Sequence, residues 1–318
     1  MKLKSIVASI AVVGLVAVYG LFFRPDLTVS KAEAKAKYSL PNSHFINFNG
    51  AEIHYTESGS GFPVLMIHGF GGSSRDFLAL DSLINDRYRV IRIDMPGFGL
   101  SDFPKQSSAR TDFMQVYNDY FNFILDTLHI DSCYVMGNSL GGLMACQLTL
   151  SHPDVVKKLV LFNSAGYEMQ EVMKTANATL LQNSAVQQIV KRGAPKFMVK
   201  MGIRRVVYDA RSLTPEKLQR VTDLWNRDGN MAHLIAMATT DSFPDENRIK
   251  EITCPTLIFW GRQDKIVNVK YADRFHTDIK DSRLIVYDSC GHVPMLERPE
   301  DVKRDVLQFL NQDSETTL

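Results

Sequence analysis

The feature that most restricts the fold is a series of short apolar runs, separated along the chain by helix-patterned segments. Each run has the length and composition of a buried strand. Strands that alternate with helices form a mostly parallel sheet that is covered on both faces. The sequence therefore predicts an α/β fold with strands at 63–68, 88–94, 133–137, 158–163, 256–261 and 283–288, preceded by a hairpin that turns at Asn49-Gly50.

The alternation stops between about 165 and 245, where the pattern is helical without a convincing strand. This stretch separates two runs that should be neighbours in the sheet, so we interpret it as a helical cap inserted over the strand ends. The predicted domains are an N-terminal apolar anchor at 1–24, a polar linker at 25–43, a core at 44–164 and 246–318, and the cap at 165–245.

Residues 5–23 form an apolar run without a charged residue. A helix of this length spans roughly 28 Å, about one hydrocarbon core. The run ends within "FFRPD", and small-residue patterns come only later, so an uncleaved membrane anchor is favoured over a cleaved signal peptide. Basic residues flank both ends and leave the orientation open, with an extracytoplasmic catalytic domain as the preferred expectation.

The overall charge excludes one class of partner. Lys and Arg number 36, Asp and Glu number 35, and the net charge is +1, so no global field favours nucleic acid. The four cysteines are widely spaced in or beside apolar runs, without CxxC or Cys/His ligand spacing. We interpret them as buried thiols and expect no metal site.

Three polar residues follow predicted strands in the chain order serine, acid, histidine. Ser139 lies in "GNSLG" after one strand, Asp264 follows the run at 256–261, and His292 follows the run at 283–288. Sites in parallel sheets gather at the carboxyl ends of strands. The order matches one known serine–acid–histidine arrangement, so the sequence predicts a serine nucleophile on a tight strand-to-helix turn.

The chemistry of acyl transfer requires these residue types. His292 would take the proton of the Ser139 hydroxyl and later protonate the leaving group, while Asp264 would hold the imidazole in the required tautomer. A tetrahedral oxyanion needs two backbone donors, for which we expect the N–H groups of Phe70 and Leu140.

Other residues at the strand ends receive structural interpretations. We expect His68 to hold its own loop and Asp94 to fix the loop that follows it. Asn163 ends a strand and resembles a residue that orients a catalytic histidine, but the charged Asp264 is the preferred candidate.

The motifs "HGFGG", "DMPGFGLSD", "GNSLGG", "GRQDKIV" and "CGHVPMLERPE" resemble those of the α/β-hydrolase superfamily over roughly 44–311. The nearest resemblance is to membrane-anchored monoacylglycerol lipases and related bacterial lipases and esterases. They share the N-terminal apolar segment, "HGF", an element like "NSAGY", "WGRQD" and "GH…ERP". This resemblance implies an α/β-hydrolase fold without a cofactor, Ser139 as nucleophile, Asp264 and His292 as charge relay, and Phe70 and Leu140 as oxyanion donors. The implied substrate is a small lipid or other carboxylic ester with an apolar acyl chain, cleaved through an acyl-enzyme.

The main alternative is the carbon–carbon bond hydrolases of aromatic ring-cleavage pathways, which share "GNS" and "GG" at the turn. They usually carry a Trp after the catalytic Gly-His and an Arg near the start of the cap. Here Val293 occupies the position of the Trp, and "NSAGYEM" contains no Arg. These two differences favour an ester hydrolase over a carbon–carbon bond hydrolase. Dehalogenases and epoxide hydrolases place Asp at the position of Ser139. A non-enzymatic ligand receptor on the same fold is disfavoured by the intact set of catalytic residues.

Two features of the cap bear on its ligands. Six methionines lie in it, and flexible apolar side chains suit a pocket for an acyl chain, although they equally suit a packed core: Met169, Met173, Met198, Met201, Met231 and Met237. Seven basic and no acidic residues lie between Val172 and Tyr208: Lys174, Lys191, Arg192, Lys196, Lys200, Arg204 and Arg205. On a helix begun at Pro195, three of them share one face, which is either a solvated surface or a membrane-docking face.

Overall fold

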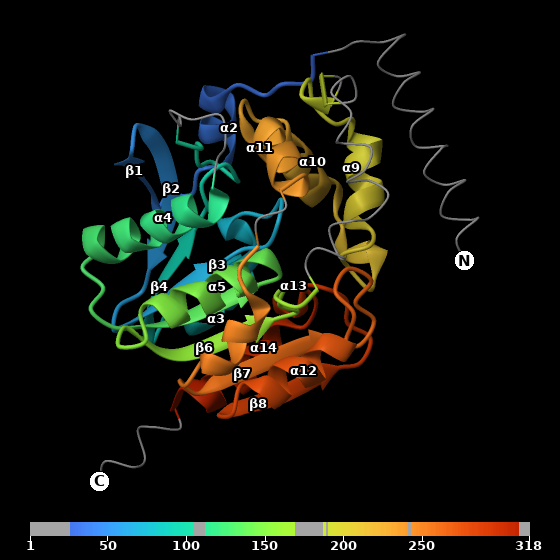
Figure 1. Ribbon diagram of the computed structural model, residues 1–318. Coiled ribbons are helices and arrows are strands. Elements are labelled where there is room, and N and C mark those ends of the chain that lie inside the picture. Colours follow the sequence, from blue (N-terminus) through green and yellow to red (C-terminus); the bar gives the residue numbers. More distant parts are fainter. Residues whose placement is uncertain (1–25, 105–111, 169–186, 189, 241–242, 312–318) are drawn as a thin grey trace.

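The computed structural model describes residues 26–104, 112–168, 187–188, 190–240 and 243–311, and this part of the chain forms one eight-stranded sheet (Figure 1). The strand order is β1-β2-β4-β3-β5-β6-β7-β8. β1 and β2 pair antiparallel, as do β2 and β4, and all other pairs are parallel. The strands are β1 (Ser43–Phe48), β2 (Ala51–Ser58), β3 (Phe62–Ile67), β4 (Tyr88–Ile93), β5 (Cys133–Asn138), β6 (Val156–Phe162), β7 (Thr256–Gly261) and β8 (Ser282–Tyr287). The predicted mostly parallel sheet is confirmed.

Alternate residues of each central strand pack on opposite faces of the sheet. In β3, Leu65 and Ile67 join one apolar core, whereas Val64 and Met66 join the other. This two-sided burial explains why the strands read as continuous apolar runs. The predicted hairpin turn is also present, since Asn49 and Gly50 have φ of 50° and 78°, the signs that a two-residue hairpin turn requires.

Helices cover both faces of the sheet. Tyr117 of α4 and Phe275 of α12 belong to one core, and Leu80 of α3 and Val302 of α14 belong to the other. The helices of the core are α3 (Leu78–Ile84), α4 (Phe113–Thr127), α5 (Leu140–Ser151), α12 (Lys270–Asp278), α13 (Pro294–Glu297) and α14 (Pro299–Leu310), with short 3₁₀ turns η1 (Ser74–Phe77) and η3 (Glu246–Glu251).

The expected cap contains α9 (Lys196–Ile203), η2 (Ala210–Ser212), α10 (Pro215–Trp225) and α11 (Asn230–Ala238), all between β6 and β7 in the chain. The described residues of this stretch form no strand. In Figure 1, α9 (yellow) forms the outer edge of the group, while α10 and α11 lie closer to the core. Cap and core are joined by direct contacts, such as the hydrogen bond from Trp225 Nε1 to the carbonyl oxygen of Gly71 (2.7 Å).

The segment expected to be a polar linker contains a packed helix, α2 (Lys31–Tyr38). Its apolar side chains Ala34 and Tyr38 are buried, and the Tyr38 hydroxyl donates to Asp223 of α10. Lys37 pairs with the same carboxylate at 2.7 Å. The segment is polar on average, so its composition predicts a linker. The packing of the helix depends on only two buried positions, one helical turn apart, which an average over the segment does not detect.

The predicted anchor at 5–23 lies outside the described residues. Within residues 26–104, 112–168, 187–188, 190–240 and 243–311, no helix combines the length and the hydropathy that a membrane span requires.

Candidate active site

Ser139 occupies a strained turn between β5 and α5. Its φ of 54° and ψ of −119° are unusual for a residue with a side chain. Two glycines make the turn sterically possible: a Cβ on Gly137 would lie 2.2 Å from the carbonyl oxygen of Gly141, and one on Gly141 would lie 2.2 Å from that of Ile67. The turn therefore holds the serine at the carboxyl end of the central strand, as the motif predicts.

The structure brings His292 and Asp264 together from the loops after β8 and β7. His292 Nδ1 lies 2.7 Å from Asp264 Oδ2. The other carboxylate oxygen, Oδ1, accepts the backbone N–H groups of Ile266 (2.7 Å) and Val267 (3.1 Å). Both side chains are almost fully buried. A carboxylate held by these donors fixes the imidazole with Nδ1 protonated and leaves Nε2 as the basic nitrogen.

Asn163 supports this pair, a role that sequence reasoning missed. Its Nδ2 donates to Asp264 Oδ2 at 2.6 Å, and its Oδ1 accepts the N–H of Gly261 at 3.2 Å. Asn163 is fully buried with φ of 44°, a conformation that Asn tolerates better than most residues. It supports the acid instead of replacing it. The one feature of the sequence that could have indicated this role is an Asn directly after a buried strand, where the backbone must turn sharply.

The two expected oxyanion donors flank the serine. Leu140 begins α5, and Phe70 follows Gly69, on which a Cβ would lie 3.2 Å from the Ser139 Cβ. Neither N–H has a hydrogen-bond partner within the described ranges. Two free donors beside a nucleophile are what a developing oxyanion requires.

His68 holds the loop that carries Phe70, as predicted. The N–H of Met95 donates to His68 Nε2 at 3.1 Å, so the proton resides on Nδ1, which donates to the carbonyl oxygen of Gly69 at 2.7 Å. His68 is fully buried, and this bonding uses both ring nitrogens. It therefore positions the loop and has no nitrogen free for proton transfer.

Asp94 also has its predicted structural role. It accepts the N–H groups of Ser74 (2.6 Å) and Leu100 (2.8 Å) and contacts His54 Nδ1 at 2.7 Å. Burial favours the protonated acid, but the neighbouring His54 and these donors prevail and hold the pKa of Asp94 well below its usual range.

Ser43 lies 2.7 Å from His54 Nε2 and completes a second serine–histidine–acid series. That series ties β1 to the loop after β4, where its acid is already saturated by backbone donors.

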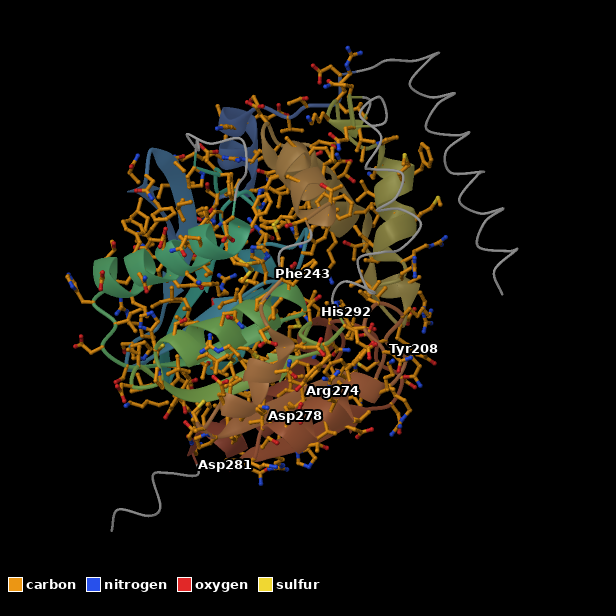
Figure 2. The ribbon with its side chains drawn as sticks, in the orientation of Figure 1. Tyr208, Phe243, Arg274, Asp278, Asp281 and His292 are labelled. Atoms are coloured by element: carbon orange, nitrogen blue, oxygen red, sulfur yellow. The ribbon has the colours of Figure 1, made fainter. Side chains whose placement is uncertain are left out.

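The cap contacts the histidine loop directly. The N–H of His292 donates to the carbonyl oxygen of Val206 at 2.8 Å. Glu297 accepts the N–H of Gly291 (2.9 Å) from the histidine loop and that of Tyr208 (2.7 Å) from the cap. In Figure 2, His292 lies toward the interior and Tyr208 toward the outer edge of the molecule. The cap segment after α9 thus supports the loop that carries His292.

The four cysteines are free, and three of them are buried. Burial raises the pKa of Cys133 and Cys290 to about 12 and that of Cys254 to about 11. The prediction of buried thiols is confirmed for Cys133, Cys146 and Cys290, whereas Cys254 is half-buried. The raised pKa values keep these thiols protonated at neutral pH.

Comparison with known proteins identifies relatives that align across most of this chain. A 2-hydroxy-6-oxononadienedioate/2-hydroxy-6-oxononatrienedioate hydrolase from Burkholderia vietnamiensis is 32% identical over 271 residues, which cover 82% of this chain and 91% of the relative. A 2-hydroxy-6-oxo-6-phenylhexa-2,4-dienoate hydrolase from Comamonas testosteroni is 28% identical over 272 residues, with the same coverage of both chains. A solved structure of a serine hydrolase involved in carbazole degradation has 26% identity and a TM-score of 0.69, and covers 85% of this chain and 98% of its own.

These relatives contradict the expected ester substrate. They are named as hydrolases of dienoates, and the prediction of a lipase or monoacylglycerol lipase is therefore wrong. The two signals behind that prediction have other physical explanations. Val293 is only 6% exposed and packs in the core beneath the site. Met231 and Met237 are buried in the other core, and Met201 is exposed.

The relatives agree with the match to a family model. The model of the alpha/beta hydrolase fold matches residues 63–195 and 208–299, which include the serine turn, the acid and the histidine. The chain therefore belongs to the α/β-hydrolase family.

Proposed function

We propose that the protein is a serine hydrolase that breaks a carbon–carbon bond in a 2-hydroxy-6-oxo-2,4-dienoate, the product type of aromatic ring cleavage. The observation that carries this proposal is the alignment with the Burkholderia hydrolase, 32% identical over 91% of that relative. An alignment of this extent includes the cap as well as the core. The cap covers the strand ends and sets the shape of the substrate site.

In the proposed reaction, the Ser139 hydroxyl attacks the ketone carbon C6 of the substrate. His292 Nε2 accepts the hydroxyl proton, and Asp264 stabilises the imidazolium across the 2.7 Å contact with Nδ1. The ketone oxygen becomes an oxyanion, which the N–H groups of Phe70 and Leu140 stabilise. These are the roles expected from the sequence, applied to a ketone in place of an ester.

The next step breaks the bond between C5 and C6. The substrate reacts as its 2-oxo tautomer, in which the proton of the 2-hydroxyl group has moved to C5 and the double bond lies between C3 and C4. The electron pair of the broken bond passes to C5 and is delocalised through this double bond to the oxygen at C2. The proton held by His292 neutralises this fragment, which leaves as a 2-hydroxydienoate. The remaining acyl group on Ser139 is released by water as a carboxylic acid, so that one water molecule is consumed per bond broken.

The chain differs at two positions from the usual pattern of such hydrolases. Val293 stands where a Trp is usual, and no Arg lies in "NSAGYEM". Val293 packs into the core, and the contact between His292 and Asp264 is present with Val at this position. We therefore expect the attacking group and its base to be unchanged by these differences.

The test compares dienoates with esters on the full-length protein. Loss of the absorbance of 2-hydroxy-6-oxo-6-phenylhexa-2,4-dienoate and of the nonadienedioate would be followed beside a series of acyl esters. The expected result is a higher kcat/KM on a dienoate. Ser139→Ala should reduce turnover by at least about 10³-fold, because the attacking group is lost. Ser151→Ala, at the exposed end of α5, is the matched control and should retain the activity.

Either of two results would reject the proposal. One is a kcat/KM on any acyl ester that exceeds the value on every dienoate. The other is dienoate turnover by Ser139→Ala at the level of the Ser151→Ala control.

A further inference from the structure

We propose that the outer surface of α9 is a docking face for an anionic phospholipid bilayer. This docking face consists of Lys196, Phe197, Lys200, Met201 and Arg204, all of which are exposed. The proposal is independent of the reaction that the active site catalyses.

The basic residues of the docking face share one side of the helix. Lys196, Lys200 and Arg204 recur every four positions and fall within an arc of about 80° at 100° per residue. The buried Val199 lies about 100° from the middle of this arc, on the flank away from Phe197 and Met201. The positive charges therefore point outward together.

Most of these charges lack a neutralising partner. Lys200 and Arg204 form no ion pair within the described ranges, and neither do the neighbouring Lys191 and Arg205. Arg192 lies within electrostatic range of Asp26. Lys196 donates to the neutral amide of Gln219 at 2.8 Å, with Glu216 as the nearby acid. Asp209, the next acid along the chain, is already paired with Arg211. The net charge of the docking face is thus positive.

Large apolar side chains lie beside these charges. Phe197 is 47% exposed and Met201 is 56% exposed. Tyr208, shown near the outer edge in Figure 2, is also exposed, so three of the six large exposed apolar side chains of the described chain lie on or next to α9. Exposed Phe and Met are unfavourable in water but favourable at the boundary between headgroups and acyl chains. Positive charge with adjacent apolar groups matches an anionic bilayer better than a soluble polyanion.

The position of the first described residues also favours an anionic bilayer as the partner of the docking face. The described residues begin at Asp26, and the N–H of Leu27 donates to the carbonyl oxygen of Arg192 at 2.9 Å, just before α9. The described chain therefore begins beside the docking face, three residues after the end of the uncharged run 5–23 in the sequence. Figure 1 shows this end of the described chain close to the segment that leads into α9. A bilayer that holds the apolar run would lie next to the charges that favour it.

The test uses the full chain in every sample, so that residues 5–23 contribute equally. Phe197→Trp introduces a reporter whose fluorescence is quenched by lipids with brominated acyl chains. Vesicles of phosphatidylcholine would be compared with vesicles that also contain phosphatidylglycerol. The signals of Trp225 and Trp260 are subtracted with protein that lacks the reporter.

The variant that tests the charges is Lys196→Glu/Lys200→Glu/Arg204→Glu. A matched control, Lys157→Glu/Lys250→Glu/Lys280→Glu, reverses three exposed charges near the amino ends of β6, β7 and β8, away from the cap. Each basic residue near an anionic surface contributes about fivefold to partition, so three contribute on the order of a hundredfold. We expect quenching of the reporter only with phosphatidylglycerol, loss in the α9 variant, and retention in the control.

Three outcomes would overturn the proposal: equal quenching in both triple variants, quenching that does not depend on phosphatidylglycerol, or no quenching in either vesicle. Thermal unfolding of each variant shows whether the fold is retained. If the α9 triple variant fails to fold, Lys200→Gln/Arg204→Gln replaces it, and unchanged quenching in that neutral variant would reject the docking face equally.

Discussion

The N–H of His292 donates to the carbonyl oxygen of Val206, 2.8 Å away, so a residue of the cap holds the proposed general base by its backbone. Glu297 reinforces the contact, because its two carboxylate oxygens accept one N–H from each side, Gly291 and Tyr208. Cap and histidine loop therefore act as one unit. A displacement of the segment after α9 would displace the imidazole as well.

Glu297→Gln should lower kcat by about tenfold with a smaller effect on KM. The variant places an amide donor opposite a backbone N–H, which removes one charge-assisted hydrogen bond of about 1.5–3 kcal/mol. Both carboxylate oxygens of Glu297 accept backbone N–H groups, so the side chain is a positioning group. Glu300→Gln, at an exposed position of α14, is the control. Identical steady-state kinetics of the two variants would contradict the coupling.

Asn163→Asp should lower kcat by at least about tenfold. The substitution replaces the amide that donates to Asp264 Oδ2 with a second carboxyl group, and two carboxyl groups at this distance repel each other unless they share a proton, which disturbs the contact of Asp264 with His292 Nδ1. Asn163→Leu should lower kcat less, because it removes the hydrogen bond without adding a repulsive group. Asn247→Asp, on the exposed surface, is the control. A kcat of Asn163→Asp equal to that of this control would show that Asn163 does not position the acid.

Trp225→Phe should reduce kcat/KM by about tenfold while Tm changes little. The indole Nε1 donates to the carbonyl oxygen of Gly71 at 2.7 Å, in the loop that presents the N–H of Phe70. Gly71 has φ of 68°, and a Cβ there would lie 2.9 Å from Nε1, so Gly71→Ala should have the larger effect. If the kcat/KM of Trp225→Phe equals that of the wild type on every substrate, the cap does not position the loop that carries Phe70.

The fold could be predicted because its signals are local. A buried parallel strand must be apolar on both faces, so β7 reads directly as "TLIFWG" at Thr256–Gly261. The positions of Ser139, Asp264 and His292 at strand ends then follow from topology, since parallel strands bring their carboxyl ends to one edge. These elements require no knowledge of distant contacts.

The features that sequence reasoning missed depend on long-range contacts. Asn163 and Asp264 are 101 residues apart, and nothing in the pattern around Asn163 specifies its partner. The helix α2 is fixed by Asp223, which lies 185 residues from Tyr38. The substrate class failed for a related reason. The cap methionines suit either an acyl pocket or a packed core, and the structure buries Met231 and Met237 in an apolar core. The residue type at position 293 was used as a sign of the substrate, but Val293 is buried in the second apolar core. An apolar residue type does not reveal which surface it faces.

His233 of α11 should make the stability of the protein depend on pH below neutrality. Its ring stacks on Phe103, with centroids 4.4 Å apart, and its Nε2 lies 3.0 Å from the Tyr117 hydroxyl. Burial lowers the pKa of His233 to about 3. The ring therefore stays neutral in the folded state, because the described residues around it place no anion beside a charged imidazolium.

The sign of the effect follows from linkage. In the unfolded chain the histidine has a pKa of about 6.5 and binds a proton that the folded state rejects. The contribution of His233 is therefore fully present above pH 6.5 or so and is lost as the pH falls toward 3, with a slope of up to about 1.4 kcal/mol per pH unit. His233→Phe retains the ring packing and should flatten the free energy of unfolding across this range. His276→Gln, at an exposed position of α12, should leave the slope unchanged. Urea denaturation at a series of pH values measures both, and parallel curves for wild type and His233→Phe would show that His233 becomes charged without loss of the fold.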